Sequence, residues 1–108
     1  MTSFKITMEE AFKALIETNK SFIKLLENGS MKVEYYAPKK IDLQTPHMQD
    51  ELYIIISGNG TFLHDKEMVD FKPHDVLFVP AGMDHRFINF TDDFATWVVF
   101  YGNDGGEK

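Results

Sequence analysis

The chain has 108 residues, which is enough for one domain with a single hydrophobic core. Its 11 lysine and arginine residues against 17 aspartate and glutamate residues give a net charge of −6. This acidic balance, without a basic stretch beyond Lys39 and Lys40, argues against nucleic-acid binding. No apolar run reaches the roughly 20 residues of a membrane span, and the absence of cysteine excludes disulfides and thiolate metal sites. We therefore expect a globular, cytoplasmic protein that binds neither nucleic acid nor membrane.

Residues 1–30 are predicted to form an N-terminal helical segment. Between Thr7 and Asn28 the apolar residues repeat with a helical period of about 3.6 residues and share one face: Phe12, Leu15, Ile16, Phe22, Ile23 and Leu26. Thr7 followed three residues later by Glu10 forms a capping box, and Asn28–Gly29 is a plausible helix stop. The polar residues 18–21 allow two shorter helices, with Ser21 capping the second.

Residues 31–108 change to short runs typical of β-strands, separated by turn residues. The runs cover residues 32–38, 51–57, 62–71, 71–82, 84–90 and 94–102, with a hairpin turn at Asp65–Lys66. A spacing of about ten residues per strand and turn is the pattern of a β-sandwich or barrel. The sequence therefore predicts one mostly β domain preceded by the helical segment.

A candidate metal site lies where the run at 51–57 begins. Side chains alternate along an extended chain, so His47 and Glu51, four residues apart, are expected to share a face. His85 follows a Pro-Ala-Gly turn that leads into another predicted strand. Two imidazoles and one carboxylate form a set that suits Fe(II) and also accepts Zn, Mn, Ni or Co.

These residues resemble the two motifs of a small single-domain cupin. His47, Glu51 and Gly58 match the second histidine, the glutamate and the closing glycine of the first cupin motif. The second motif is matched by four residues: Pro80, Gly82, His85 and Asn89. The resemblance covers Lys32 to about Tyr101 and implies a double-stranded β-helix, a jelly-roll barrel with the helical segment packed on it or on a dimer partner.

The first motif departs from the cupin pattern at one ligand position. Thr45 stands where cupins carry the first histidine, so the usual set of three histidines and one glutamate is reduced to His47, Glu51 and His85. Similarity to mannose-6-phosphate isomerases, which carry glutamine there, suggests Gln44 or Gln49 as a fourth ligand. Thr45 and Tyr53 are candidates for a supporting or catalytic role beside the metal.

The resemblance implies a divalent metal cofactor, a small-molecule ligand and a homodimer. The expected function is that of a metal-dependent enzyme on a small substrate with carboxylate, sugar or enediol-type oxygens, as a dioxygenase, an isomerase or epimerase, or a lyase. Two alternatives stay open at this point. One is a non-catalytic cupin that binds a sugar-like molecule, and the other is a vestigial barrel that serves as a scaffold.

Overall fold

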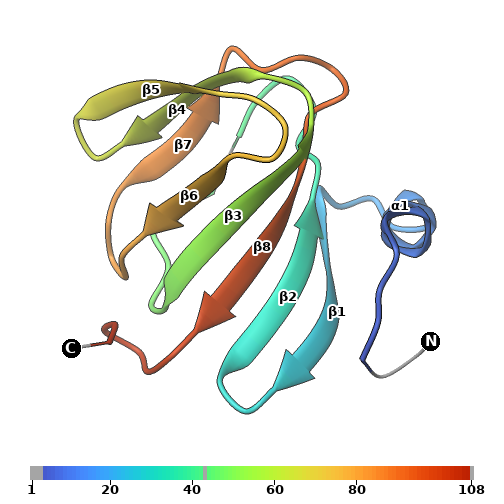
Figure 1. The fold of residues 1–108 in the computed structure, drawn as a ribbon, viewed down its shortest axis with the longest axis horizontal. Coiled ribbons are helices and arrows are strands. Elements are labelled where there is room, and N and C mark those ends of the chain that lie inside the picture. The colour runs from blue at the N-terminus through green and yellow to red at the C-terminus, as the bar shows by residue number, and fades with distance from the viewer. Residues whose placement is uncertain (1–3, 43, 108) are drawn as a thin grey trace.

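The computed structural model describes residues 4–42 and 44–107, which form two antiparallel sheets and one helix (Figure 1). The first sheet has five strands in the order β1-β2-β8-β3-β6, and the second has three in the order β5-β4-β7. In chain order the elements are α1 (Met8–Ile16), β1 (Phe22–Asn28), β2 (Met31–Tyr36), β3 (Asp50–Ser57), β4 (Gly60–His64), β5 (Glu67–Phe71), β6 (Val76–Val79), β7 (His85–Ile88) and β8 (Ala95–Tyr101).

The main core lies between the two sheets and is strongly aromatic. Its largest fully buried side chains are Tyr53, Phe62, Phe87 and Phe94. Phe87 is central, with its ring 4.7 Å from that of Phe62 and 4.6 Å from that of Phe94 between centroids. Because large aromatic rings bury much apolar area, they hold the two sheets together without disulfides. This arrangement confirms the predicted mostly β, double-stranded β-helix barrel.

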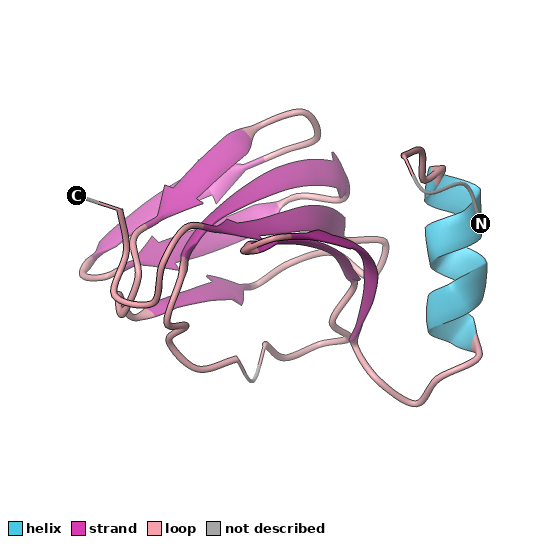
Figure 2. Cartoon of the chain, turned by 90° about the horizontal axis from the view of Figure 1, so that it is seen from below, coloured by secondary structure: helices cyan, strands magenta, loops and turns pink. Residues whose placement is uncertain are grey.

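The helix covers the outer face of the five-stranded sheet, on the side of β1 and β2 (Figure 2). The side-chain oxygen of Thr7 accepts a hydrogen bond of 3.1 Å from the backbone N–H of Glu10, which confirms the predicted helix start. Ala11 and Leu15 are buried in a second core cluster with Tyr35 of β2. No helix among the described residues is long and apolar enough to cross a bilayer.

The prediction of helix beyond residue 16 is wrong. Residues 22–28 form β1, which pairs with β2, and Asn28–Gly29 begins a hairpin turn instead of ending a helix. Gly29 has a φ of 58°, as a tight hairpin requires. The apolar spacing of this segment also fits a strand, and pairing with β2 satisfies its backbone groups, which decides between the two structures.

Two turns bring the cupin-like motif residues into place. Gly58 follows β3 with a φ of 82°, and a Cβ there would lie 2.6 Å from the Cα of Phe94, so only glycine fits. Gly82, in the turn between β6 and β7, has a φ of 79°. Asn89 directly follows β7 and has a φ of 52°, a conformation that asparagine tolerates better than most residues.

Candidate metal centre

Three side chains from separate parts of the barrel meet at one end of the space between the sheets. His47 lies in the loop before β3, Glu51 is the second residue of β3, and His85 begins β7. Their possible ligand atoms all lie within 4.8 Å of one another. His85 and Glu51 are buried, whereas His47 is half-buried at the edge of a cavity. We call these three residues the histidine–glutamate cluster.

The turn from Pro80 to Met83 holds both histidines. The backbone N–H of Gly82 donates to the carbonyl oxygen of His47 at 2.8 Å. Nδ1 of His85 lies 2.9 Å from the carbonyl oxygen of Met83, to which it donates. A ring that donates through Nδ1 turns Nε2 toward the cluster, and this is the usual way in which a backbone carbonyl orients a metal-binding histidine.

The environment of the Glu51 carboxylate indicates a site for a cation. The Glu51 side chain is 1% exposed, and among the described residues neither carboxylate oxygen accepts a hydrogen bond. Oε1 lies 2.9 Å from Nε2 of His85, but this contact has no hydrogen-bond geometry. A buried carboxylate without donors is costly unless a charge compensates it. The donor set of two imidazoles and one carboxylate therefore fits a divalent metal ion.

The electrostatics of the cluster are set by burial and by Glu51. Burial lowers the pKa of His47, which favours the neutral imidazole that a metal requires. For His85 burial also lowers the pKa, but the close negative charge of Glu51 and the hydrogen bond to the carbonyl oxygen of Met83 outweigh it and leave the pKa raised. The pKa of Tyr53 is raised well above its usual value by burial and by the charge of Glu51, so its hydroxyl stays protonated.

Of the two residues predicted as alternative fourth ligands, Gln44 lies at the cluster. Its Oε1 accepts a hydrogen bond of 2.9 Å from the hydroxyl of Tyr53. The same oxygen lies 3.4 Å from Nε2 of His47 and 3.3 Å from Nε2 of His85. The amide oxygen of Gln44 therefore lies beside both imidazoles, where it could serve as a fourth ligand.

Asp42 fixes the orientation of Gln44, and sequence reasoning missed it. The carboxylate accepts a hydrogen bond of 2.7 Å from Nε2 of Gln44, which turns Oε1 of the amide toward the cluster. It also accepts bonds from the hydroxyl of Tyr36 and the backbone N–H groups of Gln44 and Phe87. Nothing in the sequence distinguishes Asp42 from an ordinary loop aspartate, since only the fold brings Tyr36 of β2 and Phe87 of β7 to the loop that carries Asp42 and Gln44.

The other predicted site residues take different places. Gln49 does not point at the cluster: its Nε2 donates to the carbonyl oxygens of Ser30 and Gly102, and its Oε1 accepts from Lys32. Thr45 is exposed at the cavity wall. Tyr53 lies beside the cluster, with its hydroxyl 3.1 Å from Nε2 of His85.

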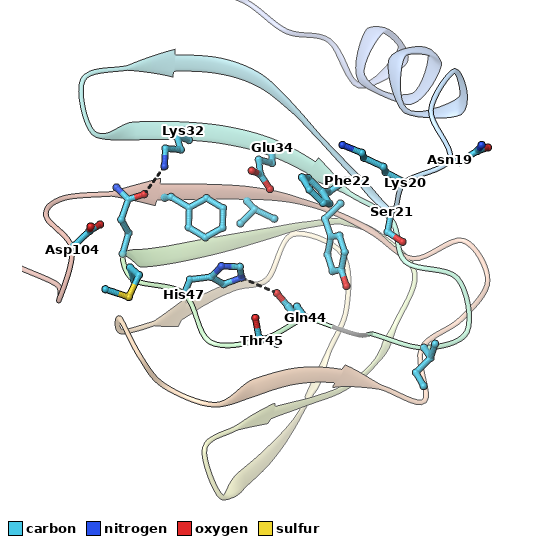
Figure 3. A pocket seen from close by; sticks show the side chains of 16 residues that line it. Asn19, Lys20, Ser21, Phe22, Lys32, Glu34, Gln44, Thr45, His47 and Asp104 are labelled. Atoms are coloured by element: carbon cyan, nitrogen blue, oxygen red, sulfur yellow. Dashed lines mark hydrogen bonds between the residues drawn. The ribbon is translucent and has the colours of Figure 1, made fainter.

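His47 of the cluster and Gln44 line a cavity of about 910 Å³. Its walls come from β1, β2, β8 and the loop that carries Gln44 and His47 (Figure 3). Lys32 and Glu34 reach into it from β2, on the side opposite His47 and Gln44. A volume of this size accommodates an organic molecule well beyond a bound ion and its waters.

Comparison with known proteins gives a consistent result. Residues 32–101 match the family described as Cupin domain. A protein of Streptomyces coelicolor, described as uncharacterized, is 31% identical over 102 residues, which are 93% of this chain and 95% of that protein. A candidate mannose-6-phosphate isomerase from Ralstonia eutropha has a similar structure, with a TM-score of 0.64 and 26% identity over 76% of this chain and 83% of that one. A cupin superfamily protein from Desulfitobacterium hafniense has a TM-score of 0.65 and 20% identity, over 86% of this chain and 89% of that one.

Proposed function

Because the chain belongs to the cupin family, we propose that it is a metal-dependent enzyme acting on a small organic substrate rich in oxygen atoms. The proposed metal ligands are His47, Glu51 and His85, with Oε1 of Gln44 as the fourth. This set leaves room on the cavity side for substrate atoms, as catalytic metal sites require.

The single observation that carries this proposal is the unpartnered carboxylate of Glu51 between two imidazoles. A scaffold protein has no use for such a group, because a buried polar atom without a partner costs about 1–3 kcal/mol. A cation would compensate it and would explain why two motifs far apart in the chain converge on one point.

A bound divalent metal ion would supply Lewis-acid polarisation of a substrate oxygen, or oxygen chemistry if the ion is iron. The chain's own residues would hold the ion in place. The Tyr53 hydroxyl stays protonated, because burial holds its pKa high, and it donates its hydrogen bond to Oε1 of Gln44, which would keep that oxygen directed at the ion. Glu51 and Gln44 would present only oxygens toward the ion.

Among the reaction classes expected of such a site, isomerisation has some support from similarity. The structural relative from Ralstonia eutropha carries that name, and its 26% identity extends over most of both chains. The donor set itself accepts Fe, Zn, Mn, Ni or Co and does not choose among the dioxygenase, isomerase or epimerase and lyase reactions.

The experiment is elemental analysis of untagged protein purified without chelator, together with calorimetric titration of each metal. Wild type is compared with His47→Ala and with His74→Asn. His74 is exposed, far from the cluster in the barrel, and has a positive φ that asparagine tolerates. We expect near-stoichiometric metal in wild type and in the His74→Asn control, and its loss in His47→Ala.

The same samples test catalysis. Loaded protein is incubated with a panel of small carboxylates, sugars and enediols, and turnover should disappear with chelator and return with one metal. Failure of all metals to bind wild type would contradict the proposal. Binding of metal and stabilisation by a panel member, without any product, would favour the non-catalytic binding cupin.

A further inference from the structure

The register of the five-stranded sheet places the ammonium group of a lysine, Lys32, on the same inner face as the histidine–glutamate cluster, two strands away. Lys32 on β2 pairs with Phe100 on β8, and Phe100 pairs in turn with Glu51 on β3. Residues aligned across adjacent strands point to the same face, so these three side chains form one row on the inner face. Two strand spacings of roughly 4.8 Å separate the backbones of Lys32 and Glu51, or about 10 Å.

A second row of inward-facing side chains lies two residues further along each of the same three strands. Glu34 on β2 pairs with Val98 on β8, and Val98 pairs with Tyr53 on β3. Phe100 and Val98 therefore form an apolar floor between a polar side on β2 and the cluster on the side of β3. All of the β2 and β8 side chains in these two rows line the cavity.

Lys32 is held in place without being neutralised. Its Nζ donates to Oε1 of Gln49 at 3.2 Å, and both amide hydrogens of Gln49 are used on the carbonyl oxygens of Ser30 and Gly102. Among the described residues no carboxylate forms an ion pair with Lys32. An ammonium has three donors, so a half-buried lysine with one neutral partner is ready to bind an anion.

Two acidic side chains also line this cavity, Glu34 and Asp104. Asp104 is exposed, whereas Glu34 is half-buried beside Lys32 on the same strand face. Burial and the nearby charge of Glu51 raise the pKa of Glu34, against the lowering effect of Lys32 and Lys24. Glu34 therefore takes up a proton more readily than a free glutamic acid does, and in that form it donates a hydrogen bond to a neighbouring anion.

We propose that Lys32 is an anion-binding subsite and that the ligand of this cavity is an organic acid with two oxygen-rich ends. One end lies at the histidine–glutamate cluster, the short apolar middle lies over Phe100 and Val98, and a carboxylate- or phosphate-type end binds Lys32. The inference rests on the proposed function, because the first end is anchored by the metal. It narrows the substrate class from any oxygen-rich molecule to a bifunctional acid.

The test uses Zn²⁺-loaded full-length protein and pairs of probes that differ in one end group. Glutarate is compared with valerate, adipate with caproate, and phosphonopropionate with butyrate, by calorimetric titration. Wild type is expected to bind each dianion roughly ten- to hundredfold more tightly than its monocarboxylate partner, as one charge-assisted hydrogen bond supplies. The phosphonate arm distinguishes a phosphate-type end from a carboxylate end.

Four variants locate the effect. Lys32→Met keeps the aliphatic stem and should abolish the preference for dianions, and Lys32→Arg should restore it. Gln49→Leu should weaken it by leaving the ammonium unsupported. The matched control is Lys24→Gln, because Lys24 is an exposed lysine on β1 whose Nζ is already paired with Glu27. Equal binding of both members of every pair by wild type, or a preference that survives in Lys32→Met, would overturn the inference.

The experiment tests the metal site and the anion-binding subsite independently. Zn²⁺ affinity is measured first in wild type and Lys32→Met, and it should be the same in both. If wild type binds no metal, the proposed function fails and the subsite is judged in metal-free protein by amide chemical shifts. Glutarate should then shift the signals of Lys32 and Gln49 in wild type and not in Lys32→Met, and unchanged signals in wild type would refute the subsite.

Discussion

Two adjacent carboxylates at the start of β3 have opposite hydrogen-bonding environments, and the consequence of this contrast can be tested. Asp50 is satisfied: it accepts backbone hydrogen bonds from Ala81 at 2.9 Å and from Glu107 at 2.8 Å, which also lower its pKa. Glu51 has no donor among the described residues. Asp50 therefore stabilises the fold, whereas Glu51 is kept at a cost to stability, as is common for residues of functional sites.

Replacement of Glu51 by glutamine should leave the melting temperature of metal-free protein equal to or above that of wild type, because a buried charge is removed. The rise in melting temperature on adding metal should be lost. Asp50→Asn should do the reverse, with a lower melting temperature in both states and the metal-induced rise retained. Thermal unfolding of the three proteins with and without metal measures this, and a Glu51→Gln protein that still responds to metal would contradict it.

Asp42 is expected to act on the metal through Gln44. All of its recorded partners are donors, so the amide of an Asp42→Asn variant must turn its own N–H₂ toward at least one of them. We expect a loss of about 1–3 kcal/mol in the free energy of unfolding and a ten- to hundredfold weaker metal affinity, as for other residues that orient ligands.

Calorimetric titration and chemical denaturation measure the two effects of Asp42→Asn. Asp84→Asn is the control, because Asp84 is an exposed acid next to His85 and its loss changes the charge of the region equally. Metal affinity that falls in both variants would assign the effect to charge and would exclude orientation of Gln44.

At the scale of the elements, the turn after β3 is the most constrained connection. Gly58 and Gly29 both have positive φ, but a Cβ at Gly58 would lie 2.6 Å from the backbone of Phe94, whereas at Gly29 nothing lies within 4 Å. Gly29→Ala should cost about 1–2 kcal/mol for its backbone conformation alone. Gly58→Ala should cost clearly more, because β3 and the segment before β8 must move apart. Chemical denaturation of both variants checks this, and equal costs would contradict the close contact.

The strands from β2 to β8 could be predicted because each run of apolar residues is bounded by turn residues, as at Asp65–Lys66. The cluster could be predicted because two motifs fix His47, Glu51 and His85. The inward orientation of Lys32 and Glu34 could not be predicted. They alternate with apolar residues, and in a strand with one face in solvent these polar residues would be expected on the solvent side. In this barrel neither face of β2 is open to bulk solvent: α1 packs on the outer face, and the inner face lines the cavity.

For the whole molecule, a homodimer stays a prediction of the family resemblance. The five-stranded sheet has an exposed apolar area on its outer face away from α1, formed by Ile54, Val76 and Phe78. Large apolar side chains gathered on one face are typical of an interface. Sedimentation velocity should give twice the mass of the chain, and Phe78→Lys should shift the protein toward monomer. A wild-type monomer at all concentrations would refute this prediction.

Among the described strands, the hairpin of β1 and β2 pairs with the rest of the sheet only through β8, while the candidate metal ligands lie on β3, β7 and the loop before β3. The part of the molecule proposed to select a ligand would thus be largely separate from the part that would act on it. Related proteins with this barrel could change the β1–β2 hairpin, and with it the ligand they bind, while keeping the same metal chemistry. A library randomised at the inward-facing positions of β2 should therefore yield altered ligand preference among variants that all still fold and load metal.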